Sequence, residues 1–515
     1  MACYETHLFY YLSTEYSTTL HRKRVVALPL VLAEVLFLSL ASLLLNIPLV
    51  FGQVTTPPPP AGDDDEPVSA LTPADQAPPA VSDPDLRIDT IATGLKHPVA
   101  MAFLGNSSDD ILVVEKDNGT VRRVIGGVVQ TEPLVDVAVA NDNNTNERGL
   151  LGMVVAPQNE TTTYVFLYYT ESGGGQDGDD AQGIVPAGNR LYRYELSQDP
   201  FTGSAKLINP KLLLDLPARP GPRYNGGPLL VSQNQTTHET TVYLIIGDLD
   251  HHETQSQNDE DGPPPDGTSG ILAVDADGNP SPNPVLVRPV TDGDAAVTDE
   301  DEEDEEDEED TNEVEEDIGM LPYYYAYGIR NSFGMDFDPV TGYIWDTENG
   351  RNDSDEINLV LPGFNSGWPV IQGPSSRPEN EDVDVEDDLV DFDGRGVYRD
   401  PEFTWITTVG PTAIKFYNST QLGEEYQNDV FVGDINNGRI YHFDLTEDRT
   451  GLMLEDNGEL EDKVADNPDE LASGGVVFGT GFRAISDIEV GPDGNLYLTL
   501  YHAGKVMKIS PEAQQ

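Results

Sequence analysis

Cysteine is almost missing from this chain of 515 residues, and basic side chains are few. The single cysteine, Cys3, leaves no intrachain disulfide possible and no thiol for catalysis in the rest of the chain. Lysine and arginine total 28 against 92 aspartate and glutamate residues, so the formal net charge is −64 and the pI about 4.1. Such a surface repels phosphates, so nucleic acid and anionic lipid surfaces are excluded as expected partners.

Several signatures of common enzymes and scaffolds are also missing. The sequence has no glycine-rich phosphate loop, no nucleophile elbow, no zinc-finger spacing and no heptad repeat. These absences exclude kinases, common hydrolases and coiled-coil scaffolds.

One apolar run, in residues 25–52, is long enough to span a bilayer. Residues 1–24 before it end in the basic cluster His21-Arg22-Lys23-Arg24 and are predicted to be cytoplasmic. The run is either an uncleaved signal anchor or a long signal peptide cut after Gly52. Both alternatives export the remainder, to the outer face of the cell membrane or into the medium. Residues 53–84, rich in proline and acids, are predicted to be a disordered linker.

Potential glycosylation triplets of the N-x-S/T type are consistent with export, although such triplets also arise by chance. They begin at Asn106, Asn118, Asn143, Asn159, Asn234, Asn352 and Asn418.

Residues 85–512 alternate short apolar runs with turn dipeptides, and the chain holds 48 glycines and 39 prolines. This pattern predicts an all-β sandwich, barrel or propeller. An acidic insertion at 299–317 repels itself and is predicted to be a solvated loop.

The most informative stretch is 323–370. Two short apolar runs, 334–337 and 343–346, are joined by the turn Asp338-Pro339-Val340-Thr341-Gly342, which predicts a β-hairpin. Polar residues lie in the loops on both sides of it, which is how a sheet protein presents a binding site.

Within this stretch the pattern GxRNxxGxxFDPxTGxxWxxExG, followed by DEINxxxPGxNxGWP, resembles the glucose/sorbosone dehydrogenase family. The resemblance implies a six-bladed β-propeller that binds pyrroloquinoline quinone (PQQ) and calcium. It further implies a dehydrogenase that oxidises an aldose sugar or similar alcohol and passes the electrons to an external acceptor.

The resemblance also assigns roles to single positions. Arg330 would steady the reacting oxygens and Asn331 would bind PQQ. Tyr224 stands where the family has a histidine base. An unperturbed phenol, with a pKa of ~10, is a poor base at neutral pH. Tyr224 is therefore either a base assisted by a cation such as Arg223, or a hydrogen-bonding or stacking residue.

Calcium has two expected sites in the family. The residues that match the first, held by backbone carbonyls beside PQQ, are Gly350 and Arg351. Glu356 matches an acidic ligand of a second, structural calcium, and hard oxygen ligands suit this ion. His251 and His252 form a further metal candidate, or one of them a substitute base.

Three other positions depart from the family pattern. Glu147 stands where glutamine is frequent, Asn436 where a lysine is expected, and Arg483 one step out of register with an arginine that grips PQQ. PQQ is a tricarboxylate, so lost cations remove charge-assisted hydrogen bonds. Two hypotheses follow: a PQQ- and calcium-dependent dehydrogenase, or a non-catalytic cell-surface binding propeller with a degraded pocket.

Overall fold

The structure, a computed structural model, describes residues 76–141, 147–159, 162–199, 202–234, 239–250, 252–287, 318–455 and 457–512. The predicted segments 1–24 and 25–52, most of the linker and the acidic insertion 299–317 lie outside these ranges. Within the described ranges, no helix combines the length and the hydropathy needed to cross a membrane.

The described strands form six sheets. The first contains β3 (Pro98–Phe103), β4 (Asp110–Glu115), β5 (Thr120–Ile125), β6 (Val128–Val129) and β7 (Val135–Asp136). The second contains β8 (Leu150–Pro157), β9 (Thr163–Glu171), β10 (Gly188–Gln198) and β11 (Ala205–Leu216). The third contains β12 (Leu229–Gln233), β13 (Thr240–Ile246), β14 (Gly270–Asp275), β15 (Tyr324–Tyr327), β19 (Phe364–Asn365) and β20 (Val397–Tyr398).

The other three sheets come from the second half of the chain, completed by two early strands. The fourth contains β16 (Ser332–Phe337), β17 (Ile344–Glu348), β18 (Asp355–Val360), β21 (Phe403–Trp405) and β25 (Val464–Ala465). The fifth contains β22 (Pro411–Phe416), β23 (Val430–Asp434), β24 (Ile440–Phe443), β26 (Val477–Thr480) and β1 (Ala80–Val81). The sixth contains β27 (Ile485–Val490), β28 (Leu496–Leu500), β29 (Lys505–Pro511) and β2 (Leu86–Thr93).

Helical turns are short and lie in the connections. They are η1 (Asp180–Gln182), η2 (Gln255–Gln257), η3 (Leu321–Tyr323), η4 (Pro378–Asn380), η5 (Glu424–Tyr426), η6 (Gly458–Asp462) and α2 (Pro468–Ser473).

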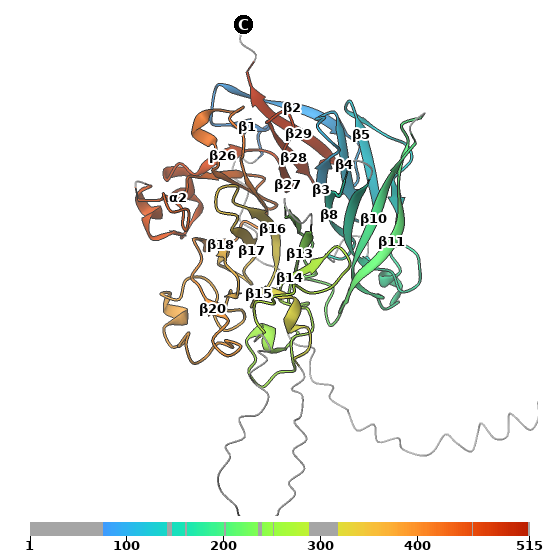
Figure 1. The fold of residues 1–515 in the computed structure, drawn as a ribbon. Helices are drawn as coiled ribbons and strands as arrows, with labels where there is room; N and C mark the ends of the chain where they lie inside the picture. The colour runs from blue at the N-terminus through green and yellow to red at the C-terminus, as the bar shows by residue number, and fades with distance from the viewer. Residues whose placement is uncertain are drawn as a thin grey trace, which may run out of the picture. The chain divides into compact units, whose positions relative to one another are not determined.

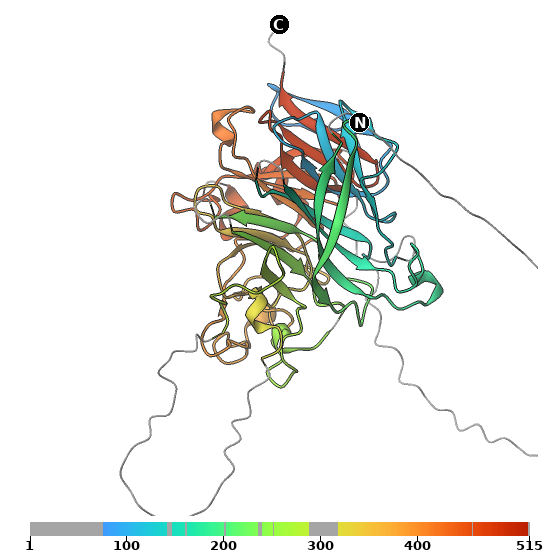
Figure 2. The same cartoon turned by 45° about the vertical axis from the view of Figure 1, so that its right-hand side comes forward.

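The sheets follow one another around a ring. The first strand of each sheet contacts that of the next, and the cycle β3, β8, β12, β16, β22, β27 returns to β3. The ring closes because β2, near the start of the described chain, pairs with the C-terminal β29, Leu86 opposite Pro511. Figures 1 and 2 show this as a blue strand beside red ones. The all-β propeller predicted from the sequence is confirmed.

Apolar layers between neighbouring sheets hold the ring together. The largest joins the fourth and fifth sheets and contains Trp345, Trp405, Phe403 and Tyr441, all fully buried. The ring centroids of Trp405 and Phe403 lie 4.9 Å apart in an edge-to-face arrangement. Because each sheet contacts a neighbouring sheet on either side, its strands bury side chains on both faces, which explains why apolar residues follow one another in the short runs.

The structure bears on two local predictions, the hairpin and the linker. The hairpin is confirmed, since β16 and β17 pair antiparallel with Phe337 opposite Ile344. The last residues of the segment predicted to be a linker, 53–84, contain the short strand β1. Ala80 in β1 pairs with Thr480 of β26, and Asp83 accepts a hydrogen bond from the Tyr426 hydroxyl at 2.9 Å. A two-residue strand in a proline-rich stretch has no periodicity, so only its partner strand makes it visible.

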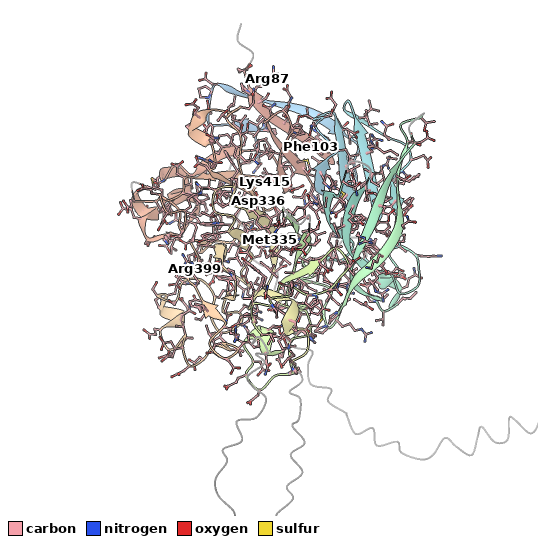
Figure 3. The ribbon with its side chains drawn as sticks, viewed as in Figure 1. Arg87, Phe103, Met335, Asp336, Arg399 and Lys415 are labelled. Carbon is pink, nitrogen blue, oxygen red and sulfur yellow. The ribbon has the colours of Figure 1, made fainter. Side chains whose placement is uncertain are left out.

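A lysine links three of the innermost strands. The Lys415 ammonium on β22 lies 3.2 Å from Asp336 on β16 and 2.9 Å from Glu489 on β27. Figure 3 shows Lys415 and Asp336 side by side in the middle of the fold. These carboxylates raise the pKa of Lys415 although burial opposes its charge, so the lysine stays protonated.

We expect Lys415→Met to lower the free energy of unfolding by about 3 kcal/mol, because Asp336 and Glu489 would keep their charges without a partner. Urea denaturation at pH 7 measures the loss. Lys211→Met is the matched control. Lys211 pairs with Asp277 in a largely exposed ion pair, which contributes less than about 1 kcal/mol. Equal losses in the two variants would contradict a structural role for Lys415.

Candidate functional site

The predicted site residues gather at one mouth of the ring, where the innermost strands begin. Glu147 precedes β8, Tyr224 precedes β12, and Arg330 and Asn331 precede β16. Gly350 follows β17, which runs antiparallel to β16 and so ends at the same mouth. By the same argument Lys116, Asn436 and Arg483 also lie at this end, since they follow β4, follow β23 and precede β27.

Arg330 and Tyr224 form the centre of the site. The Arg330 guanidinium donates a hydrogen bond to the Tyr224 hydroxyl and lies 4.2 Å from the centre of the ring. Both residues are buried. A Cβ atom on Gly247 would lie 2.4 Å from the Arg330 carbonyl oxygen and 2.6 Å from that of Tyr224. Glycine at 247 therefore lets the two loops meet.

Glu147 completes this group. One of its oxygens, Oε2, accepts a hydrogen bond from the Tyr224 amide, which stands in a left-handed conformation at φ +60°. Burial raises the pKa of Glu147 to about 7, although the Tyr224 amide and the charges of Arg330 and Lys116 oppose the rise. A carboxyl group with this pKa exchanges a proton readily at neutral pH, which is the property of a general base.

Gly350 and Arg351, predicted to hold calcium by their carbonyls, lie beside Arg330. The guanidinium of Arg330 donates to the carbonyl oxygens of Asn349 at 2.8 Å and Gly350 at 2.6 Å. The Arg351 side chain is exposed. A guanidinium bonded to the Gly350 carbonyl does not fit a calcium ion on the same oxygen, because two cations would share one acceptor.

Asn331 is buried next to this pair, and its amide oxygen has no hydrogen-bond partner among the described residues. The Arg330 Nε atom is likewise buried and without a partner there. Two such orphaned polar atoms carry a desolvation cost that a polar ligand would remove. They fit the predicted cofactor contacts of Arg330 and Asn331.

Asn436 and Arg483 lie at the same mouth, after β23 of the fifth sheet and before β27 of the sixth. The backbone amide of Asn436 donates a hydrogen bond to the Val409 carbonyl at 3.2 Å. A Cβ atom on Gly438 would lie 2.1 Å from the backbone nitrogen of Arg483. Arg483 is exposed. The structure therefore brings Glu147, Tyr224, Arg330 and Gly350 into contact but records no contact of Asn436 or Arg483 with them.

Glu356 belongs to a buried group of acids on one face of β17 and β18. The group adjoins Arg330, whose backbone amide donates a hydrogen bond to Glu348 Oε1 at 2.6 Å. Asp346 pairs with Asn358, and Glu348 with Glu356, on alternate rungs of the ladder, so the four side chains share a face. All four are buried, and both Asp346 carboxylate oxygens and the Asn358 amide oxygen lack a hydrogen-bond partner among the described residues. Burial and the charge of Glu348 raise the pKa of Asp346 and Glu356, and burial raises that of Glu348 to about 7.

Oxygen ligands that share one face of the sheet, several of them without a hydrogen-bond partner, fit a calcium ion. The sequence analysis named Glu356 alone and missed Asp346, Glu348 and Asn358. The signal was present as acids or amides at i and i+2 on two strands that pair, but it becomes visible only once the register is known.

Two other polar sites lie elsewhere. His252 forms an ion pair with Asp266 at 2.6 Å, and His251 lies outside the described residues. A surface hollow of about 750 Å³ is lined in part by Arg399, Glu402 and Lys463, and Figure 3 marks Arg399. Glu402 forms ion pairs with Arg399 at 2.8 Å and with Lys463 at 2.7 Å, so these charges of the hollow are already compensated within the protein.

Known proteins share this architecture. The aldose sugar dehydrogenase YliI of Escherichia coli is 24% identical over 86% of this chain and 97% of its own length. The quinoprotein glucose dehydrogenase B of Acinetobacter calcoaceticus is 23% identical over 59% of this chain and 56% of its own. Among solved structures, the PQQ-bound aldose sugar dehydrogenase of Streptomyces coelicolor has a TM-score of 0.53 at 20% identity, over 83% of this chain and 98% of that one.

A sequence model of a whole protein family also matches this chain. The sequence model described as Glucose / Sorbosone dehydrogenase matches residues 95–292 and 307–508. These two ranges span most of the ring of sheets and include the mouth with Glu147, Tyr224 and Arg330. The chain therefore belongs to the glucose/sorbosone dehydrogenase family.

Proposed function

We propose that this protein is a PQQ-dependent dehydrogenase that oxidises an aldose sugar or similar alcohol outside the cytoplasm, and that each of its six sheets is one propeller blade. The observation that carries the proposal is the contact of Glu147, Tyr224 and Arg330 at one mouth of the ring. It unites a half-buried carboxyl group suited to proton transfer with a buried hydroxyl group and a buried, fixed cation.

In this proposal Glu147 takes the place of the family's histidine base. Its Oε2 atom is held by the Tyr224 amide, so Oε1 accepts the proton from the substrate hydroxyl. Arg330 stabilises the negative charge that develops on the substrate oxygen, because its guanidinium is fixed by Tyr224, Asn349 and Gly350 before substrate arrives. Tyr224 orients the guanidinium.

PQQ would be held by Arg330 and Asn331, whose orphaned atoms face no other partner among the described residues. Lys116 and Arg223 act on Glu147 electrostatically and add positive charge at the same mouth, which suits a tricarboxylate. Once bound, PQQ would supply the two-electron acceptor for the carbon that is oxidised. The electrons would then pass to an external acceptor.

Calcium, in this proposal, binds the acids of β17 and β18, namely Asp346, Glu348 and Glu356, with Asn358. The resemblance assigns Glu356 to a structural calcium, and the unpaired oxygens around it support that assignment. The carbonyls of Gly350 and Arg351 take no part, because Arg330 already bonds the first of them.

A second candidate, a non-catalytic cell-surface binding propeller, has one observation in its favour. The three described partners of the Arg330 guanidinium satisfy two of its nitrogen atoms, which is also how a purely structural arginine is held. Under this alternative the mouth would recognise a glycan or a protein without redox chemistry.

Titration of the protein with PQQ in the presence of calcium distinguishes the two candidates. We expect saturable PQQ binding and aldose-dependent reduction of a dye by the unmodified protein. A Tyr224→His variant, measured beside it, shows what the family's own base adds. Activity of the His variant alone would mark an intact pocket that has lost its base. Absence of PQQ binding in both proteins would leave only the binding module.

A further inference from the structure

We propose that Asp429, His442 and Asp444 form a binding site for a divalent transition metal of the zinc type, on the fifth sheet and separate from the mouth of the ring. One ligand atom from each of these side chains lies within 4.8 Å of the other two. The His442 Nε2 atom is 3.1 Å from an Asp429 oxygen and 3.8 Å from an Asp444 oxygen. Ligands 2.0–2.2 Å from a tetrahedral zinc ion are themselves about 3.4 Å apart, and the two distances from His442 Nε2 lie close to this value.

The β-ladder explains why the three side chains converge. Phe431 pairs with His442 and Val430 with Phe443, so Asp429 and Asp444 fall on the next rung. Because side chains alternate along a strand, His442 and Asp444 share a face. The site therefore rests on a hairpin and not on a loose cluster of surface acids.

The backbone and the imidazole ring are both held in place. The Asp429 carbonyl accepts from the Tyr417 amide at 2.8 Å, and the Asp444 carbonyl accepts from the Met453 amide at 2.8 Å. The His442 ring packs against Phe431, with ring centroids 4.9 Å apart, and against the edge of Tyr426 at 5.2 Å. Ligands that are already oriented lose little entropy when the metal binds.

Charge and exposure suit an ion with one or more bound water molecules. Among the described residues, Asp429 and Asp444 both form an ion pair with His442, and neither pairs with a lysine or an arginine. The Asp444 side chain is 58% exposed, whereas those of Asp429 and His442 are 13% and 21% exposed. Solvent thus reaches one side of the site and can fill the remaining coordination positions. The nitrogen ligand favours zinc and its neighbours over calcium or magnesium, which prefer oxygen.

Calorimetric titration of the full-length protein with Zn²⁺, in excess calcium, tests the site. We expect His442→Asn to bind one equivalent less than the unmodified protein. His252→Asn, which removes a histidine paired with only one carboxylate, should bind as the unmodified protein does. Equal stoichiometry in all three proteins would overturn the proposal.

A second variant distinguishes loss of a ligand from loss of folding, because the His442 ring packs against Phe431 and Tyr426 and its replacement could unfold the protein. Asp444→Asn changes an exposed side chain and should weaken Zn²⁺ binding at least 10-fold without shifting the Tm in the absence of metal. Co²⁺ in place of Zn²⁺ should give a visible absorption band that this variant loses. An unchanged affinity and an unchanged cobalt spectrum would rule out Asp444 as a ligand and the site with it.

Discussion

Replacing Glu147 by glutamine is expected to lower kcat/KM for aldose oxidation by ~10²–10⁴-fold, the contribution that a positioned general base makes. Glutamine keeps the size of the side chain and the oxygen that accepts from the Tyr224 amide, but it cannot take a proton. In the unmodified enzyme kcat/KM should rise with pH through about 7, because Glu147 must lose its proton before it acts as a base. The variant should lack this rise.

The same substitution should stabilise the fold above pH 7. The pKa of Glu147 is raised on folding, so its stabilising effect is full below the unfolded pKa and is lost as pH rises toward 7. A neutral glutamine avoids this loss, and thermal unfolding at pH 8 should show a gain on the order of 1–3 kcal/mol. Lower activity with higher stability is the signature of a group kept for function.

His97 supplies the control for the assignment of the base. It precedes β3, at the same mouth, and its ring stacks on Tyr501 with centroids 4.6 Å apart. If Glu147→Gln retains the rise in kcat/KM with pH and His97→Gln loses it, the base is His97. If neither variant changes the profile, the proton passes to a group outside this set.

Calcium is expected to have the largest effect on stability, through the acids of β17 and β18. An ion at a concentration a thousandfold above its Kd adds about 4 kcal/mol to the free energy of unfolding, so EDTA should lower the Tm by several degrees. Without the ion, Asp346, Glu348 and Glu356 repel one another, and burial raises their pKa values. The fold should therefore lose stability in EDTA as pH rises above about 4.

Asp346→Asn is expected to change stability in opposite directions in EDTA and in calcium. In EDTA the variant should be more stable than the unmodified protein, because it removes one buried acid from the group. In millimolar calcium the order should reverse, because the variant has lost a ligand. Glu379→Gln, whose side chain is 66% exposed, should differ little from the unmodified protein in both conditions. A Tm that is the same in calcium and in EDTA would contradict a calcium site here.

The sequence predicted the β-hairpin of 334–346 because its information is local: a proline and a glycine in the turn, and alternating apolar residues in the strands. The motif around Arg330 and Asn331 was visible for the same reason, since it is contiguous. Glu147 was named only as a changed cofactor contact. Its proposed role as a base rests on its pKa, and that pKa depends on burial and on charges from Lys116, Arg223 and Arg330.

The sequence by itself determined the all-β class, the family and the loop that carries Arg330, because turn chemistry, alternation and motifs act over a few residues. Only the tertiary structure decided which distant residues meet. It placed β2 beside β29, Glu348 beside Glu356, and Asp429 beside His442 and Asp444. The physical reason is that strand pairing and burial are properties of partners, and a partner in a β-ring can lie hundreds of residues away along the chain.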